Sequence, residues 1–113
     1  MKKGEIYFAD LNPTVSSEIK KNRPVLIVSN DANNRYSSLI TVIPLTSQVD
    51  KVYPFEVMLR TNDSGLPKAS KAQCNQIRTI SRQRITSSRT AGKISPELLF
   101  KIQSAIKLHL DMD

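Results

Sequence analysis

Histidine, cysteine and tryptophan are nearly absent from this 113-residue chain, which has one histidine, one cysteine and no tryptophan. The lone Cys74 cannot form a disulfide within the chain, and one cysteine with His109 makes no ligand set with zinc-site spacing. No Walker loop, GxGxxG or GxSxG phrase occurs. We therefore expect no disulfide framework, no metal and no cofactor, and two-histidine ribonuclease chemistry cannot be built within the chain.

Long apolar runs are also missing, since the longest, such as 25–28, span only a few residues. A helix needs about 20 apolar residues to cross a bilayer. The basic N-terminus is interrupted by glycine and acidic residues before a signal-peptide core can form. We expect a cytoplasmic protein with no membrane segment and one domain, 1–113, to which self-association would add buried surface.

Acidic residues are missing from one long segment of a chain whose formal charge is +7. Between Asp63 and Glu97 every charged residue is basic: Lys68, Lys71, Arg78, Arg82, Arg84, Arg89 and Lys93. Such a concentration of charge attracts phosphate backbones and acidic protein segments alike. A solvated surface that only keeps the protein soluble fits the charge equally well, so charge alone leaves nucleic-acid binding open.

Short β-branched runs separated by turn formers predict a mainly β fold. The expected strands are Gly4 to Asp10, Arg23 to Asn30, Leu39 to Ile43, Phe55 to Leu59 and one or two within 70–80. Helical turns are expected in 31–38 and 82–85, and a turn in 62–67. Pro44 is expected to take residues 45–47 out of the sheet and into a loop, because proline lacks a ladder donor.

The C-terminus predicts a helix. Ser95 suits the N-cap and Pro96 the first helical position. Apolar residues then recur at spacings of three, four and four from Leu99 to Leu110, so we expect an amphipathic helix from about 96 to 110. Together with five or six short strands, it indicates a small curled antiparallel SH3-like barrel with a C-terminal α-helix, whose strand order stays open.

Two side chains at the expected strand ends could carry chemistry. Arg23 enters one strand and Thr46 follows another, and each is close to a proline. Arginine offers a planar fork of donors matched to phosphate oxygens and stays charged, so it suits charge stabilisation better than proton abstraction. Taken alone, Arg23 fits a surface arginine and Thr46 a turn residue. Cys74 fits a buried cysteine, and His109 a partly exposed histidine near a helix C-terminus.

Four phrases occur in the order found in the MazF/PemK toxin family, and the chain resembles that family over nearly its whole length. The phrases are Gly4 to Pro13, Arg23 to Asp31, Pro44 to Ser47 and Gln76 to Ile80. The resemblance implies a homodimer with an SH3-like barrel and a C-terminal helix, neutralised by an acidic MazE-like antitoxin laid over the RNA groove. It also implies a metal-independent endoribonuclease acting on single-stranded mRNA. In that reaction the RNA 2′-hydroxyl attacks the adjacent phosphorus and leaves 2′,3′-cyclic phosphate and 5′-hydroxyl ends.

The resemblance also assigns roles to residues. It makes Arg23 the catalytic arginine and Thr46 the catalytic threonine, and Glu18 is our candidate for the proton acceptor. Arg78 would attract phosphate or support the dimer. The residues expected to contact RNA are Ser17, Lys20, Lys21, Gln76 and Arg78.

The chain also departs from the family pattern. Many relatives carry a glycine-rich stretch, roughly GSEQGGVRP, where this chain has SSEIKKNRP at 16–24. This segment is more basic and visits positive φ less freely, so we expect a different cleavage sequence. Relatives also tend to have an acidic residue where Asn75 stands, which leaves the role of that carboxylate open.

Two other functions remain open. One is a CcdB-like toxin that blocks a protein target, gyrase, on a similar barrel; CcdB-type proteins depend on C-terminal aromatic residues, whereas this chain ends in LDMD. The other is an RNA-binding module without catalysis. Three tyrosines and three phenylalanines offer few surfaces for base stacking.

Overall fold

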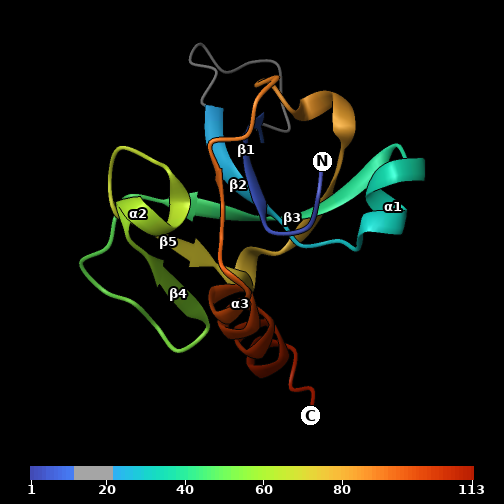
Figure 1. Ribbon diagram of the computed structural model, residues 1–113. Helices are drawn as coiled ribbons and strands as arrows, with labels where there is room; N and C mark the ends of the chain where they lie inside the picture. The colour runs from blue at the N-terminus through green and yellow to red at the C-terminus, as the bar shows by residue number, and fades with distance from the viewer. Residues whose placement is uncertain (12–21) are drawn as a thin grey trace.

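The computed structural model describes residues 1–11 and 22–113. Its strands are β1 (Glu5–Asp10), β2 (Asn22–Ile27), β3 (Leu39–Thr46), β4 (Glu56–Leu59), β5 (Ser70–Gln73), β6 (Arg78–Ser81) and β7 (Gly92–Lys93). Its helices are α1 (Asp31–Tyr36), α2 (Thr61–Ser64) and α3 (Pro96–His109), with 3-10 turns η1 (Cys74–Gln76) and η2 (Arg82–Arg84). Figure 1 shows the strands curling above α3, with α1 and α2 at opposite sides.

The strands form one antiparallel sheet in the order β4-β5-β3-β2-β1-β7, and β6 pairs with β3 outside this path. The expected curled, mainly β fold with a closing C-terminal helix is confirmed. The helical turns expected in 31–38 and 82–85 are α1 and η2, and the segment 70–80 supplies β5 and β6. The two-residue β7 was not expected, because so short a pairing leaves no pattern in the sequence.

The central strand β3 changes partners along its length. Its first half, 39–42, pairs with β6, whereas Leu45 and Thr46 pair with β5. The expectation that Pro44 would send residues 45–47 into a loop is therefore wrong for Leu45 and Thr46, whereas Ser47 does lie beyond the strand. Pro44 lies in the gap between these two pairings, so the ladder on that side needs no donor from it.

Alternating side chains of β2 and β3 enter two separate apolar clusters. On β2, Leu26 packs into one cluster while Val25 and Ile27 pack into the other, so both faces of the strand are buried. The first cluster, between the sheet and α3, consists of Ile6, Leu26, Ile43, Leu45, Val57, Leu59, Leu66, Ala72, Cys74, Ile94, Ile102 and Ala105. The second consists of Ala9, Val25, Ile27, Ile40, Val42 and Ile80.

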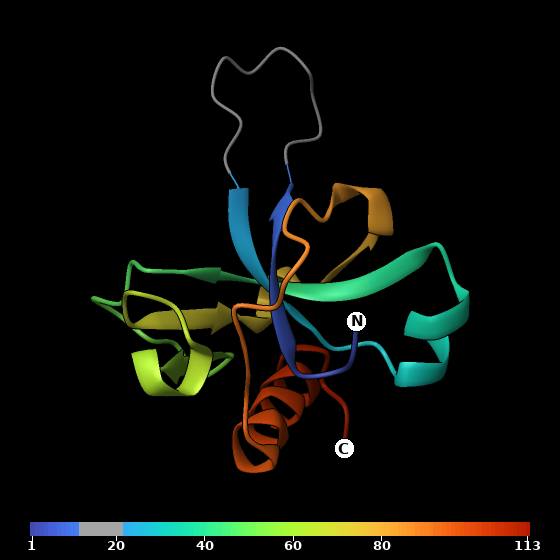
Figure 2. The same cartoon turned by 45° about the horizontal axis from the view of Figure 1, so that its top comes forward.

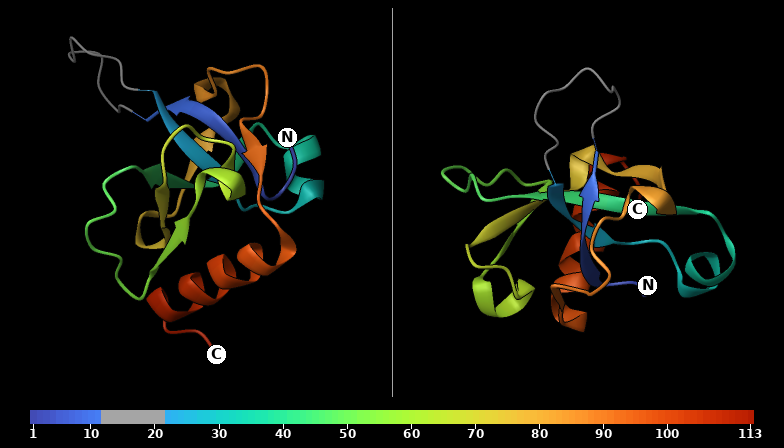
Figure 3. Two further views of the ribbon diagram at one scale, coloured as in Figure 1. Left: turned by 60° about the vertical axis from the view of Figure 1, so that its left-hand side comes forward. Right: turned by 90° about the horizontal axis from the view of Figure 1, so that it is seen from above.

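Helix α3 closes the first cluster and packs against β4 and η1, as Figure 3 shows. It begins as expected, since the Ser95 hydroxyl accepts a hydrogen bond from the Leu98 N–H at 3.2 Å and Pro96 occupies the first turn. Ile102 is fully buried, but Leu110, expected on the same apolar face, is 50% exposed because it follows the last helical residue. Within residues 1–11 and 22–113, no helix has the length and apolar character needed to cross a membrane.

Candidate active site

A hollow opens where β2 and β3 separate. Their pairing ends at Val25 and Pro44. From there β2 continues beside β1, whereas β3 continues beside β5, so the start of β2 and the end of β3 diverge (Figure 2). The hollow at this split has a volume of about 440 Å³.

Arg23 and Thr46 both line this hollow. Each lies two residues beyond the last pair, Val25 with Pro44, so the same register places them level with each other on the two diverging strands. Arg23 is exposed and Thr46 is half-buried. The fold thus brings together the two residues that the family phrases single out from separate parts of the sequence.

The lining of the hollow combines apolar groups with hydrogen-bonding ones. The apolar residues are Phe8, Pro24, Leu45, Leu66 and Pro67, and the polar residues besides Arg23 and Thr46 are Asn22, Ser47, Gln48, Lys68 and Ser70. Lys68 adds a second positive charge, and no acidic side chain occurs in the part of this lining that the structure describes. Cations and hydroxyls beside apolar surface suit a phosphate that carries a nucleobase.

The Thr46 hydroxyl is held by the backbone that follows it. Its oxygen accepts a hydrogen bond from the N–H of Gln48 at 3.2 Å. A hydroxyl that accepts from a backbone N–H still has its own hydrogen to donate. Thr46 can therefore offer a hydrogen bond to an oxygen atom placed in the hollow.

The structure does not bring every expected site residue to the hollow. Gln76 ends η1 and Arg78 begins β6, and neither lines it. Arg78 Nη1 instead lies 3.5 Å from the carbonyl oxygen of Leu11. The expected residues Ser17, Glu18, Lys20 and Lys21 lie outside the described residues.

The basic segment is not one open cationic surface. Arg82 donates to the carbonyl oxygens of Asn34 and Ser37, and Arg84 Nη1 donates to that of Asp10 at 3.2 Å. Lys71 is buried in an ion pair. These three cations hold parts of the fold together. Fewer positive charges are therefore available to a phosphate backbone than the net charge of this segment indicates.

Lys68 and Ser70 are lining residues that sequence reasoning did not single out. Lys68 was one of seven basic residues in its segment, with nothing to separate it from the rest. Ser70, the first residue of β5, is only 3% exposed. Their place in the hollow follows from the pairing of β5 with β3, which is long-range information.

Neither Cys74 nor His109 lines the hollow. Burial, with a smaller contribution from the charge of Glu56, raises the pKa of the Cys74 thiol to about 12, so it stays protonated and a poor nucleophile. The interpretation of Cys74 as a buried cysteine is confirmed. His109 is exposed at the end of α3, with its ring 6.2 Å from that of Phe55. No group of three or more His, Cys, Asp or Glu side chains placed to hold a metal ion occurs in residues 1–11 and 22–113.

The sequence profile of the PemK-like, MazF-like toxins of type II toxin–antitoxin systems matches residues 2–110. The chain belongs to this family. It is 42% identical to the endoribonuclease MazF9 of Mycobacterium tuberculosis, over 99% of this chain and 98% of that protein. It is 37% identical to the endoribonuclease EndoA of Bacillus subtilis, over 97% of this chain and 94% of that protein.

Solved structures of the family share the fold. An endoribonuclease from a mycobacterial species, in complex with its cognate antitoxin, superposes with a TM-score of 0.81 at 24% identity and covers 100% of this chain and 97% of its own. A MazE–MazF complex from Deinococcus radiodurans gives a TM-score of 0.81 at 23% identity, covering 100% of this chain and 98% of its own. The expected PemK/MazF membership and SH3-like architecture are both confirmed.

Proposed function

We propose that this toxin is an endoribonuclease that cleaves single-stranded RNA in the hollow lined by Arg23 and Thr46. The observation that carries the proposal is that these two residues, from different strands, lie level with each other on one hollow with no acidic side chain among its described lining residues. The endoribonuclease names of relatives that align over nearly the whole chain support it.

The proposed reaction is an internal transesterification. The RNA 2′-oxygen forms a bond to the adjacent phosphorus, and the bond from phosphorus to the 5′-oxygen breaks. The products are a 2′,3′-cyclic phosphate and a free 5′-hydroxyl. This step consumes no water, so the chain's part is to position the phosphate, stabilise its charge and move two protons.

Arg23 and Thr46 would act on the phosphate oxygens. The Arg23 guanidinium presents parallel donors that match two oxygens of the pentavalent phosphorane, and in a partly enclosed hollow such bonds strengthen as charge develops. Thr46 would donate its hydroxyl hydrogen to one of these oxygens while accepting from Gln48. Arg23 would also supply the proton that the departing 5′-oxygen takes up.

The 2′-hydroxyl proton needs a separate acceptor, because the Arg23 guanidinium is already fully protonated at physiological pH and has no free lone pair to take up another proton. Glu18 is the proposed acceptor, since it is a carboxylate in the segment that leads to Arg23. Ser17, Lys20 and Lys21 of the same segment are proposed to contact the RNA, as are Gln76 and Arg78.

The test is cleavage of a long unstructured RNA and of the same sequence as DNA, both in excess chelator. We expect the wild type to cut RNA only and to leave cyclic-phosphate and 5′-hydroxyl ends. Arg23→Ala and Thr46→Ala should each lose about 100-fold or more in rate, the usual effect of removing one donor to a developing oxyanion. Thr46→Ser should keep most activity because it retains the hydroxyl.

Arg89→Ala is the matched control, since it removes an exposed arginine that does not line the hollow. It should cleave like the wild type. Cleavage of DNA, dependence on a divalent metal, or full activity in Arg23→Ala would each contradict the proposed mechanism. RNA that is bound but never cut would instead indicate a non-catalytic binding module.

The proposed partners follow from the family. An acidic, MazE-like antitoxin would cover the hollow and its two cations, and a homodimer would bury exposed apolar residues such as Tyr36 and Leu39. The cytoplasm is the proposed location because mRNA is found there. Sedimentation with and without the antitoxin tests assembly, and the complex should have no ribonuclease activity.

A further inference from the structure

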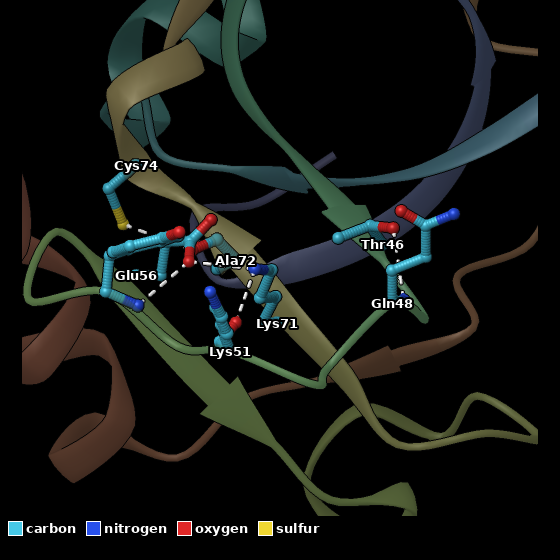
Figure 4. Close-up of polar contacts among 8 residues, drawn as sticks. Thr46, Gln48, Lys51, Glu56, Lys71, Ala72 and Cys74 are labelled. Atoms are coloured by element: carbon cyan, nitrogen blue, oxygen red, sulfur yellow. Dashed lines mark hydrogen bonds and ion pairs between the residues drawn. The ribbon is translucent and has the colours of Figure 1, made fainter.

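A buried ion pair lies beside the hollow and takes no part in the proposed chemistry. Lys71 Nζ lies 2.9 Å from Glu56 Oε1, and the two side chains are only 10% and 5% exposed. Lys71 belongs to β5 and Glu56 to β4, so the pair joins the two strands nearest the end of β3. Figure 4 shows Lys71 on β5, the strand beside Thr46, and Glu56 on the side of Lys71 away from Thr46.

Such a pair is not explained by stability alone. Taking two charges out of water costs about as much as their attraction returns, and apolar side chains of similar size often hold a fold equally well. The other contacts that the two charged groups make are therefore of interest. Both partners make further hydrogen bonds to one segment of the chain.

That segment is 47–55, which connects β3 to β4. Lys71 Nζ donates to the carbonyl oxygen of Lys51 at 2.6 Å and lies 5.6 Å from the Tyr53 ring. Glu56 Oε1 accepts from the Tyr53 N–H at 3.0 Å, and the Glu56 N–H donates to the Tyr53 carbonyl at 2.8 Å. The ion pair thus fixes the middle and the end of the segment.

The beginning of the same segment contacts the Thr46 side chain. Its hydroxyl accepts from the N–H of Gln48, the second residue of the segment. Thr46 also pairs directly with Lys71 in the register of β3 and β5. A change in the path of 47–55 that reaches Gln48 therefore moves the group that orients the Thr46 hydroxyl.

We propose that the Lys71–Glu56 pair positions Thr46 for phosphodiester cleavage by fixing the segment 47–55. The inference rests on the proposed function of the hollow. Lys71 and Glu56 are positioning residues for this reaction, since neither lines the hollow.

The main variant is Lys71→Met combined with Glu56→Met, which removes both charges without leaving one unpaired and keeps similar side-chain volumes. We expect near wild-type thermal unfolding, a kcat lowered about tenfold and a KM within about twofold, because misplacement of a catalytic group by ~1 Å costs up to about 100-fold. Glu56→Gln retains an acceptor for the Tyr53 N–H and for Lys71, so its kcat should stay within about threefold of wild type, although the unpaired Lys71 charge should lower its unfolding temperature.

The decisive experiment is a double-mutant cycle that combines Thr46→Val with the double-methionine variant. If the pair acts through the Thr46 hydroxyl, Thr46→Val should lower kcat by a much smaller factor in the double-methionine protein than in the wild type. Equal losses in both backgrounds, or wild-type kcat in the double-methionine protein, overturn the proposal while leaving the ribonuclease function intact. Glu97→Met with Lys101→Met makes the same chemical change at two exposed positions of α3 and should leave kcat unchanged.

Amide hydrogen exchange at Gln48 tests the proposal without activity. We expect this amide to exchange at least ~10-fold faster in the double-methionine protein, because local opening that loses a hydrogen bond exposes its N–H. If the wild type cleaves no RNA, the proposed function fails, and Gln48 still decides the positioning claim: unchanged exchange overturns it.

Discussion

Arg23 and Thr46 lie level with each other on two strands that no longer pair. Each is held from its outer side, Arg23 by pairing with Ala9 of β1 and Thr46 by pairing with Lys71 of β5. The inner side is open, because β2 and β3 separate beyond Val25. A substrate between them would meet two groups fixed on strands, which hold geometry better than groups on loops.

Replacing Arg23 with lysine tests whether geometry or charge matters. Lysine keeps the positive charge but presents a point charge in place of a planar fork, so it cannot bridge two phosphate oxygens in the same way. We expect Arg23→Lys to bind RNA nearly as well as the wild type yet lose at least ~30-fold in kcat, close to the loss in Arg23→Ala. Single-turnover cleavage beside a binding assay separates the two quantities. A kcat within threefold of wild type would mean that charge alone suffices.

The sequence predicted only part of the arrangement of Arg23 and Thr46. Family phrases identified Arg23 and Thr46, but local pattern predicted Thr46 in a loop beyond Pro44. It lies on β3 because that strand exchanges β6 for β5 around the proline, so the missing donor costs nothing. Strand exchange is a tertiary event, and no window of neighbouring residues encodes it.

The features with local causes were predicted well. The N-cap at Ser95 and the apolar repeat predicted α3 to within a residue at its end. The ion pair between Lys71 and Glu56 was missed, because the two residues are 15 positions apart and meet only through the pairing of β4 with β5. Sequence alone also left Lys68 indistinguishable from the other basic residues of its segment.

Lys68 should contribute to RNA binding more than to chemistry. It lines the hollow but is exposed, so it would contact a phosphate as a mobile point charge. We expect Lys68→Ala to raise KM about 3- to 10-fold with little change in kcat, and to lower the slope of log affinity against log salt by about 0.7. Lys93→Ala is the control, since Lys93 is exposed on β7 and does not line the hollow. Equal salt slopes for the two variants would contradict a specific contact at Lys68.

Gly65 ends α2 with φ of 77°, and a Cβ there would also collide with the carbonyl oxygen of Ala91. Gly65→Ala should therefore lower the free energy of unfolding by about 1–3 kcal/mol, measured by urea denaturation. Gly4→Ala separates the two causes, because Gly4 has φ of +91° but the nearest atom to its Cβ is 3.8 Å away. Gly4→Ala should lower the free energy of unfolding by less than Gly65→Ala does. Equal losses of unfolding free energy would mean that the collision with Ala91 is relieved at no energetic cost.

Cys74 should make the stability of the protein fall in alkali. Burial raises the pKa of its thiol from 9.0 to about 12 in the folded chain, so an unfolded chain loses this proton first. The thiol therefore favours the folded state fully below pH 9, and this contribution is lost as the pH rises from 9 through about 12. In Cys74→Ala no thiol titrates. Burial also raises the pKa of Tyr7, but Tyr7 titrates in both proteins, so its effect cancels in the difference between their unfolding free energies.

The measurement is urea unfolding of wild type and Cys74→Ala between pH 7 and 10.5 under reducing conditions. The difference in unfolding free energy should be constant up to about pH 8. At higher pH the unfolding free energy of the wild type should fall relative to that of Cys74→Ala, with a slope approaching about 1.4 kcal/mol per pH unit above pH 9. Cys74→Ser should follow the alanine variant, because a serine hydroxyl does not titrate in this range. A difference that stays constant to pH 10.5 would show that the thiol ionises as readily in the folded chain as in the unfolded one.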